Sequence, residues 1–278
     1  FREEAEKSVK ATFIIDALAS AENVKVEENE VMQTIYYEAM QMGQDPKDAY
    51  DKYIEAGYLP AIQMSMVEDK VLTESKNITV LGAGLIGVEV AENLNKIGKK
   101  VTIVELAPTV LSPWDSKFGN LAENVLKDNG IDVYTNTTIE DLKVENGHIV
   151  KVKLSNGDVI PCDYLLMGIG GKPNTSMLAS KGAETIRNGA IKVNAKMETN
   201  LPDIYAAGDC ASIMNIQTGE HDYFPMGTHA NKGGRAAGAN AAGGEEHFKG
   251  AYRTAIIKVF DYTLARTGMN PRALKMMN

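Results

Sequence analysis

The chain is poor in cysteine, in long apolar runs and in excess basic charge, and each deficit excludes a class of protein. Only Cys162 and Cys210 are cysteines among 278 residues. Two are too few for a disulfide scaffold, a CxxC redox pair or a cysteine-rich zinc site. No apolar stretch reaches about 18 residues, so we expect no membrane-spanning helix. The polar first residues do not form a signal peptide, and we expect a cytoplasmic protein.

Glycine and charge are distributed unevenly, which divides the chain near residue 76. Residues 1–76 contain 2 of the 25 glycines, and their 16 acidic and 8 basic side chains give a net charge of −8. Residues 77–278 contain the other 23 glycines, and their 21 acidic and 21 basic side chains cancel. Neither part has a basic excess, so nucleic-acid binding is not expected. The contrast indicates two segments of different origin.

The first segment has the pattern of an all-α helical array. Apolar side chains recur at helical spacing in residues 1–22 and again in residues 31–40. Asp45 followed by Pro46 predicts an N-cap and the first residue of a third helix. A last helix is expected over residues 58–75. We therefore predict four helices with short connections.

Five methionines fall in this segment, and they allow two interpretations. Flexible thioethers suit an adaptable apolar binding surface, but methionine also fills helical cores. The pattern alone favours core filling. The five are Met32, Met40, Met42, Met64 and Met66.

About 70 residues of this segment resemble the C-terminal, substrate-cradling domain of bacterial trigger factor, a ribosome-associated chaperone and prolyl isomerase. The resemblance rests on residues 23–30, 36–43, 45–46 and 58–66. The ribosome-binding and isomerase domains of that family have no counterpart here, so neither activity is expected. At most, the resemblance implies a surface that binds apolar peptide segments.

The second segment opens with a dinucleotide fingerprint. A β-branched run at residues 77–81 is followed by Gly82-Ala-Gly-Leu-Ile-Gly87, then by a helical stretch to residue 97 and a second apolar run at 101–104. This order of strand, glycine turn, helix and strand is typical of a Rossmann-like βαβ unit. The context makes a chance match of the glycine spacing improbable.

Each fingerprint residue has a physical reason to be there. Gly82 allows the tight turn, Gly84 lets a pyrophosphate approach the backbone, and Gly87 lets the helix pack closely on the strand. The helix N-terminus offers unpaired N–H groups to phosphates. Glu105 follows the second strand and would accept from a ribose 2′-OH, which favours NAD(H) over NADP(H). Ile86, between the glycines, completes this candidate cofactor site.

The next segments predict an α/β fold, a Rossmann-like NAD(P)-binding sheet with helices that also carries an antiparallel meander. They are a capped helix at residues 115–127, strands at 131–135 and 163–167, and hairpin turns at 146–147 and 156–157.

From residue 77 to about residue 272 the chain resembles the FAD-dependent pyridine nucleotide–disulfide oxidoreductases, and among them the coenzyme A-disulfide reductases and NADH oxidases. The order of several motifs makes the resemblance specific. They are residues 82–87, 163–170, 173–174, 199–209, 225–235 and 254–268.

The resemblance implies roles for further residues. Glu89 matches a family glutamate near the nicotinamide, although a solvent-facing helix charge is an equal alternative. Gly170 would line the nicotinamide side. Asp209, after Gly208, matches the aspartate that hydrogen-bonds the flavin ribityl chain, and a helix opening near residues 228–231 would point its N-terminus at the flavin ring. NAD(H) and FAD are thus the implied cofactors.

In this family an FAD-binding half with its own GxGxxG precedes the NAD fingerprint, and in the disulfide reductases that half carries the redox cysteine. Here no second GxGxxG and no cysteine precede Cys162, which we expect to be a core residue. FAD binding is therefore doubtful, and no catalytic residue and no coenzyme A-disulfide reduction are expected. We expect the NAD(H)-binding portion of an oxidoreductase that is incomplete as an enzyme. The alternative is a peptide-binding, chaperone-like module with a passenger dinucleotide fold.

The expected domains are residues 1–76, 77–195 and 196–278, the last being part of an FAD domain and the start of a dimerisation domain. The resemblance implies that residues 204–209 and 256–260 are strands whose sheet partners are missing, so their apolar side chains need a cover. A second copy of the chain is the favoured cover, which predicts a homodimer, and the acidic helices are the alternative. The scattered histidines predict no metal site.

Overall fold

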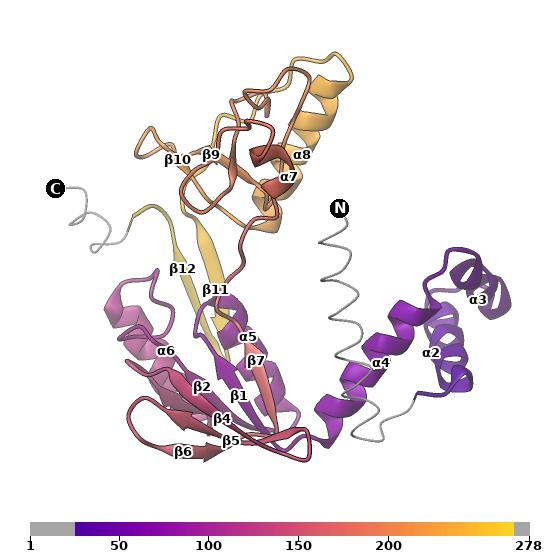
Figure 1. Ribbon diagram of the computed structural model, residues 1–278, viewed down its shortest axis with the longest axis vertical. Helices are drawn as coiled ribbons and strands as arrows, with labels where there is room; N and C mark the ends of the chain where they lie inside the picture. The colour runs from indigo at the N-terminus through magenta and orange to yellow at the C-terminus, as the bar shows by residue number, and fades with distance from the viewer. Residues whose placement is uncertain (1–25, 270–278) are drawn as a thin grey trace.

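The computed structural model describes residues 26–269, apart from the side chains of residues 68–69 and 71–74. The helix expected at residues 1–22 lies outside this range. Three parts follow one another along the chain: a helical unit, a sheet domain and a smaller second lobe (Figure 1). In the described part, no helix is long and apolar enough to cross a membrane.

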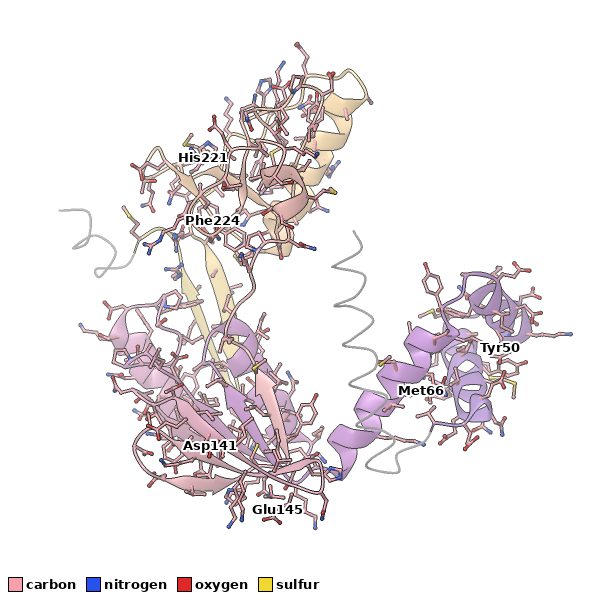
Figure 2. All side chains as sticks on the ribbon, in the orientation of Figure 1. Tyr50, Met66, Asp141, Glu145, His221 and Phe224 are labelled. Carbon is pink, nitrogen blue, oxygen red and sulfur yellow. The ribbon has the colours of Figure 1, made fainter. Side chains whose placement is uncertain are left out.

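The helical unit contains α2 (Glu28–Gln41), α3 (Pro46–Glu55) and α4 (Leu59–Glu74). The predicted cap of α3 is confirmed, because the Asp45 carboxylate accepts hydrogen bonds from the backbone N–H groups of Lys47 and Asp48. A small core of its own holds the unit together, and Tyr50 and Met66 pack against it (Figure 2). Its buried residues are Val26, Val31, Ile35, Ala39 and Ala49.

The prediction that the methionines fill this core is wrong for two of the five. Met40 and Met42 are 68% and 72% exposed, whereas Met32, Met64 and Met66 are half-buried. Helix α2 turns only a narrow stripe, Val31, Ile35 and Ala39, towards α3 and α4. Met40 belongs to the predicted stripe but lies beyond the reach of that small core.

The sheet domain is built on four parallel strands in the order β3-β2-β1-β7, which confirms the predicted Rossmann-like fold. Helices α5 and α6 connect the first three strands, and the sequence predicted each of these elements within a few residues. Their bounds are β1 (Asn77–Leu81), α5 (Leu85–Lys96), β2 (Lys100–Val104), α6 (Ser116–Asp128), β3 (Asp132–Tyr134) and β7 (Tyr164–Met167).

The two faces of this sheet are buried in different cores because strand side chains alternate. Ile78 and Val80 of β1 pack with α5 and α6, whereas Leu81 packs on the other face. An antiparallel meander covers that other face, and its first turn is the predicted Asn146-Gly147, with both residues at positive φ. The meander consists of β4 (Ile139–Glu145), β5 (His148–Leu154) and β6 (Val159–Pro161).

The second lobe has a separate core around a short three-stranded sheet, β10-β9-β8, and helix α8. The division expected at residue 195 falls inside this core, because Ala183, Ile191 and Val193 are buried together with Met197 and Ala206. The lobe's elements are α7 (Ser176–Ala179), β8 (Ile191–Lys192), β9 (Ala211–Met214), β10 (His221–Asp222) and α8 (Gly227–Ala241).

The strand expected at residues 204–209 is not formed. That segment is a loop with one isolated bridge, Glu198 to Tyr205, and the strand begins only at Ala211. The loop instead lies against α8, where Gly208 approaches Ala230. The strand that the family resemblance implied at residues 204–209 is therefore found only from Ala211 onward.

The chain returns to the sheet domain as a hairpin of β11 (Ala255–Val259) and β12 (Tyr262–Arg266). Figure 1 shows β11 beside α5. Ile257 and Val259 are 1% and 0% exposed because they pack against α5 and α6. The expectation that a second copy or the acidic helices must cover this run is therefore wrong. The dinucleotide domain's own helices cover it, so the argument for a homodimer from this run no longer holds.

A buried carboxylate fastens the hairpin to α5. Glu92 is 5% exposed, accepts a 2.8 Å hydrogen bond from the backbone N–H of Phe260, and forms an ion pair with Lys96. Phe260 has a φ of +51° at the hairpin turn, and the Lys96 ammonium lies over its ring. The carboxylate thus satisfies a turn N–H that the two-residue loop leaves free.

Candidate functional site

The glycine loop between β1 and α5 forms the centre of the candidate site. Gly82 has a φ of +100°, a region that glycine tolerates and other residues rarely adopt. A Cβ there would lie 2.7 Å from the carbonyl oxygen of Gly168, the first residue after β7. The loop is therefore wedged between two parallel strands, at the carboxyl edge of the sheet where ligands of open α/β folds bind.

Gly84 and Gly87 differ in what surrounds them. A Cβ on Gly87 would overlap the carbonyl oxygen of Gly82 and lie 3.0 Å from its carbonyl carbon, so this glycine is needed for the close packing of helix on strand. A Cβ on Gly84 would meet no protein atom within 4 Å. Gly84 is also the N-cap of α5 and has no side chain to satisfy the free N–H groups of the first turn. The space beside it is open to a ligand.

Glu105 is attached to the same loop from the end of β2. One carboxylate oxygen accepts from the backbone N–H of Ala83 at 2.5 Å, and the other accepts from the N–H of Ala107 at 2.7 Å. The side chain is half-buried. A carboxylate has about four acceptor positions, so these two bonds leave room for a ribose hydroxyl. The structure places the Glu105 carboxylate at the loop, where it braces the backbone.

Further backbone bonds hold the loop from the opposite side. The N–H of Leu111 donates to the carbonyl oxygen of Ala83 at 2.8 Å, and that of Gly82 donates to Val104 at 2.7 Å. Around this edge several apolar side chains are exposed to solvent. They are Ile86 at 65%, Leu106 at 72%, Met167 at 67% and Ile169 at 66%.

The other predicted site residues do not all join this group. Glu89 is exposed on α5, and no hydrogen bond or ion pair of its side chain is found among the described residues. Gly170, with a φ of +87°, is exposed in the loop after β7. Gly208 and Asp209 lie in the second lobe, beside α8, and Asp209 is exposed. The fingerprint therefore lies against the core of the sheet domain, whereas the Asp209 loop lies against the separate core of the second lobe.

Neither cysteine lies at this edge of the sheet. Cys162 is buried between the sheet and the meander, its thiol donates to the carbonyl oxygen of Tyr164, and burial raises its pKa. This confirms the prediction of a core residue. Cys210 is half-buried and its thiol donates to the carbonyl oxygen of Ala207. Within residues 26–269 no cluster of three or more histidine, cysteine or acidic side chains could hold a metal ion.

The sequence did not single out the partners that shape the loop. Gly168 closes the space over Gly82, and the backbone N–H groups of Ala83 and Ala107 orient Glu105. Gly168 was visible as the first glycine after an apolar run. Backbone donors carry no sequence signal, because every residue except proline has one.

The profile of the family described as pyridine nucleotide-disulphide oxidoreductase matches residues 38–222. The NADH oxidase of Methanocaldococcus jannaschii is 36% identical over 195 residues, which are 70% of this chain and 43% of the oxidase. The structure of an NAD-dependent persulfide reductase from A. fulgidus is similar with a TM-score of 0.73 and 34% identity, over 78% of this chain and 40% of that one.

The helical segment is similar to a different protein. Trigger factor of Sulfurimonas denitrificans is 80% identical over 77 residues of the N-terminal segment, which are 28% of this chain and 18% of that protein. The chain thus spans less than half the length of each relative named here.

Proposed function

Because this chain belongs to the pyridine nucleotide-disulphide oxidoreductase family, we propose that its glycine loop binds NAD(H) within an NAD(P)H oxidoreductase. The open space beside Gly84 carries the proposal. Gly82 and Gly87 are tightly packed, but no protein atom lies within 4 Å of where a Gly84 Cβ would be. A pyrophosphate in this space would meet the free N–H groups at the start of α5 and the positive end of that helix.

The residues that would hold the nucleotide are those of the loop edge. The backbone around Gly84 would bind the pyrophosphate, and Glu105 would accept from the adenosine ribose. Between Glu105 and Lys117 the sequence offers no lysine or arginine to pair with a 2′-phosphate. This supports NADH over NADPH. When bound, the nicotinamide would supply hydride, and the exposed Ile86, Leu106 and Ile169 would shield the bound nucleotide from water.

The nucleotide preference can be tested by calorimetric titration of the whole chain with NADH and with NADPH. We expect NADH to bind at least about tenfold more tightly, a difference of ~1.4 kcal/mol. The variant Glu105→Ala should lose most of this difference. Glu140→Ala, which changes an exposed glutamate of the meander, should keep it. Equal affinity of the unmodified chain for both nucleotides, or no binding of either, would contradict the proposal.

The family also implies FAD, which is the second cofactor of this proposal. Asp209 and Gly208 would hold it from the second lobe, where α8 begins at Gly227 with no side-chain cap on its first N–H groups. The purified chain should then show flavin absorbance, and Asp209→Ala should lower the bound fraction. Colourless protein that takes up no added FAD would remove flavin from the proposal without affecting NADH.

For the helical unit we infer a second function, the binding of apolar peptide segments. Four exposed side chains support it: Tyr37 at 65%, Met40 at 68%, Met42 at 72% and Tyr58 at 58%. The double variant M40S/M42S should suppress aggregation of an unfolded client less well than the unmodified chain. Met177→Ser is the matched control, because Met177 is 59% exposed but lies in the second lobe. Equal suppression by all three would contradict this function.

A further inference from the structure

Four asparagines of the chain are followed directly by glycine, and all four are exposed. They are Asn129, Asn146, Asn156 and Asn188. An asparagine in this position is prone to lose its side-chain amide, because glycine has no Cβ to hinder the attack of its backbone nitrogen on the side-chain carbonyl carbon. Sequence and exposure make the four sites equivalent, so local hydrogen bonds must distinguish them.

Three of the four sites have hydrogen bonds on both of the groups that would react. In Asn129, Asn156 and Asn188 the side-chain amide is bonded to a neighbouring residue. The partners, in that order, are the carbonyl oxygen of Val125, the backbone N–H and carboxylate of Asp158, and the N–H of Ala190. The N–H of the following glycine donates in each case to the carbonyl oxygen three residues before it, at 2.8 to 2.9 Å. Ring closure at these sites requires that such bonds break first.

Asn146 differs from the other three in both respects. Within residues 26–269 its side chain makes no hydrogen bond, and the N–H of Gly147 has no acceptor. The two residues form the turn between β4 and β5, with φ values of +53° and +86°, and a Cβ on Gly147 would meet nothing within 4 Å. Figure 2 shows Glu145, the residue before the turn, at the lower end of the sheet domain. Both reacting groups are therefore unbonded and uncrowded.

This end of the hairpin can also open at little cost. β4 is an edge strand, and all of its residues after Ile139 are exposed. Its pairing with β5 is irregular close to the turn, where the register shifts between Lys143 and Val144. Val144 is 54% exposed, so opening removes few apolar contacts. Segments with few buried contacts open locally at low free energy, which lets the Gly147 nitrogen reach the Asn146 side chain.

We propose that Asn146 is a modification site at which the folded chain deamidates spontaneously, independently of nucleotide binding. The Gly147 backbone nitrogen gives its proton to a base in the solvent and attacks the Asn146 Cγ. The bond from Cγ to the side-chain nitrogen breaks, and that nitrogen takes up a proton and leaves as ammonia. Water then opens the succinimide ring at either carbonyl carbon, which gives aspartate or isoaspartate. Water is the only co-reactant, and nothing is oxidised or reduced.

The two products change the hairpin in different ways. Aspartate keeps the length of the turn and adds a negative charge beside Glu145, which is paired with Lys143. Isoaspartate carries the chain through the side-chain carbon and so adds one atom to the backbone of the turn. Because turn type and loop length fix the register of a hairpin, isoaspartate should loosen the pairing of β4 with β5.

Tryptic mapping of the aged full chain is the test, because each of the four asparagines falls in a separate tryptic peptide. The chain is incubated at mildly alkaline pH, and the mass gain from amide to acid is followed in each peptide. We expect the peptide of residues 144–151 to be modified at least about tenfold faster than the other three, a ratio that corresponds to ~1.4 kcal/mol of local opening. In guanidinium chloride all four should be modified at similar rates. Equal rates in the folded chain, or a faster site among the other three, would overturn the assignment.

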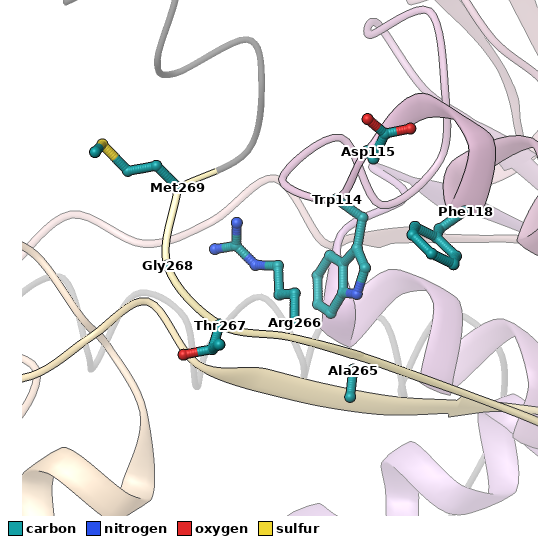
Figure 3. A pocket seen from close by; sticks show the side chains of 8 residues that line it. All are labelled: Trp114, Asp115, Phe118, Ala265, Arg266, Thr267, Gly268 and Met269. Atoms are coloured by element: carbon teal, nitrogen blue, oxygen red, sulfur yellow. The ribbon is translucent and has the colours of Figure 1, made fainter. Parts of the chain in front are cut away.

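Trp114 reports whether the chain stays folded during the incubation. It is the single tryptophan of the chain, is 4% exposed, and stands between Phe118 and Arg266 (Figure 3). Its fluorescence emission should stay constant while Asn146 is modified, as is required if the folded chain reacts. An emission change that runs parallel with the modification would assign the reaction to unfolded chain and would refute the role of the hairpin.

Two variants separate the reaction from its consequence. Asn146→Gln lengthens the side chain so that the five-membered ring cannot form, and the mass gain of its peptide should disappear. Asn146→Asp carries the charge of one product without the extra backbone atom, so its β4 and β5 amides should exchange as in the fresh chain, whereas those of the aged chain should exchange faster. An undiminished mass gain in Asn146→Gln would refute the site. Equal exchange in the aged chain and in Asn146→Asp would contradict the lengthened turn.

Discussion

Replacing Gly87 by alanine should destabilise the sheet domain, whereas replacing Gly84 should not. The new methyl group at position 87 would overlap the carbonyl oxygen of Gly82. Because this oxygen belongs to the backbone, the whole turn between β1 and α5 must move. Overpacking of this kind costs about 1–3 kcal/mol. For a domain of about 100 residues, that is a fall in Tm of roughly 4–24 °C.

At Gly84 the methyl group would enter open space with a φ of −74° that alanine accepts. The poorer N-cap costs roughly 0.5–1 kcal/mol, and the stiffer unfolded chain returns a similar amount. We therefore expect stability within about 0.5 kcal/mol of the unmodified chain. The methyl group would, however, occupy the space proposed for a pyrophosphate, so NADH affinity should fall.

Thermal unfolding by calorimetry measures the first effect, and titration with NADH measures the second. The chain has several cores, so the transition assigned to the sheet domain must be identified from amide exchange in β1 and β2. If G87A unfolds at the same temperature as G84A, the close packing at Gly87 does not determine the stability of the sheet domain. If G84A binds NADH as well as the unmodified chain does, the space beside Gly84 is not the pyrophosphate site.

Three other predictions concern the parts that hold the domain together. Glu92→Ala leaves the Phe260 N–H without its acceptor, so amides of β11 and β12 should exchange faster while those of β1 do not; unchanged exchange would contradict the clamp. Asp163 accepts from the backbone N–H groups of Lys76 and Asn77. Burial alone would raise its pKa, but these bonds hold the pKa below its usual value. The Asp163 carboxylate therefore contributes about 1 kcal/mol or less to the free energy of unfolding, because the site is exposed. This contribution is complete above the unfolded pKa near 3.8 and is lost as the pH falls through the lower folded pKa. The free energies of unfolding of Asp163→Ala and of the unmodified chain, measured in urea, should converge as the pH is lowered into the acid range. A difference that grows in acid would contradict this role of Asp163. A thiol reagent at neutral pH should modify Cys210 well before Cys162, whose pKa is raised by burial; equal rates in the folded chain would show that Cys162 is accessible.

Local signals predicted most of the sheet domain. The spacing of Gly82, Gly84 and Gly87, and the short, continuously apolar strands β1 and β2 that flank them, depend on neighbours close in sequence. The same holds for Asp45 as the cap of α3 and for Asn146-Gly147 as a hairpin turn. These features need no knowledge of distant contacts, and the structure places each where it was predicted.

Long-range packing accounts for what the sequence did not predict. Nothing near Ile257 indicates that α5 and α6, more than 100 residues earlier, will cover it. The exposure of Met40 depends on how small the helical core is, which the spacing does not reveal. The bracing of Glu105 by the N–H of Ala83, 22 residues earlier, appears only when two segments distant in sequence are brought together.

Amide chemical shifts would locate the bound nucleotide on the chain residue by residue. Backbone amide resonances of the isotope-labelled chain should be recorded with and without NADH. We expect the largest shifts at Ala83, Gly84, Leu85 and Ile86, with smaller shifts at Leu106 and Ala107. Shifts confined to the second lobe around Gly208 and α8, or none at saturating NADH, would contradict it.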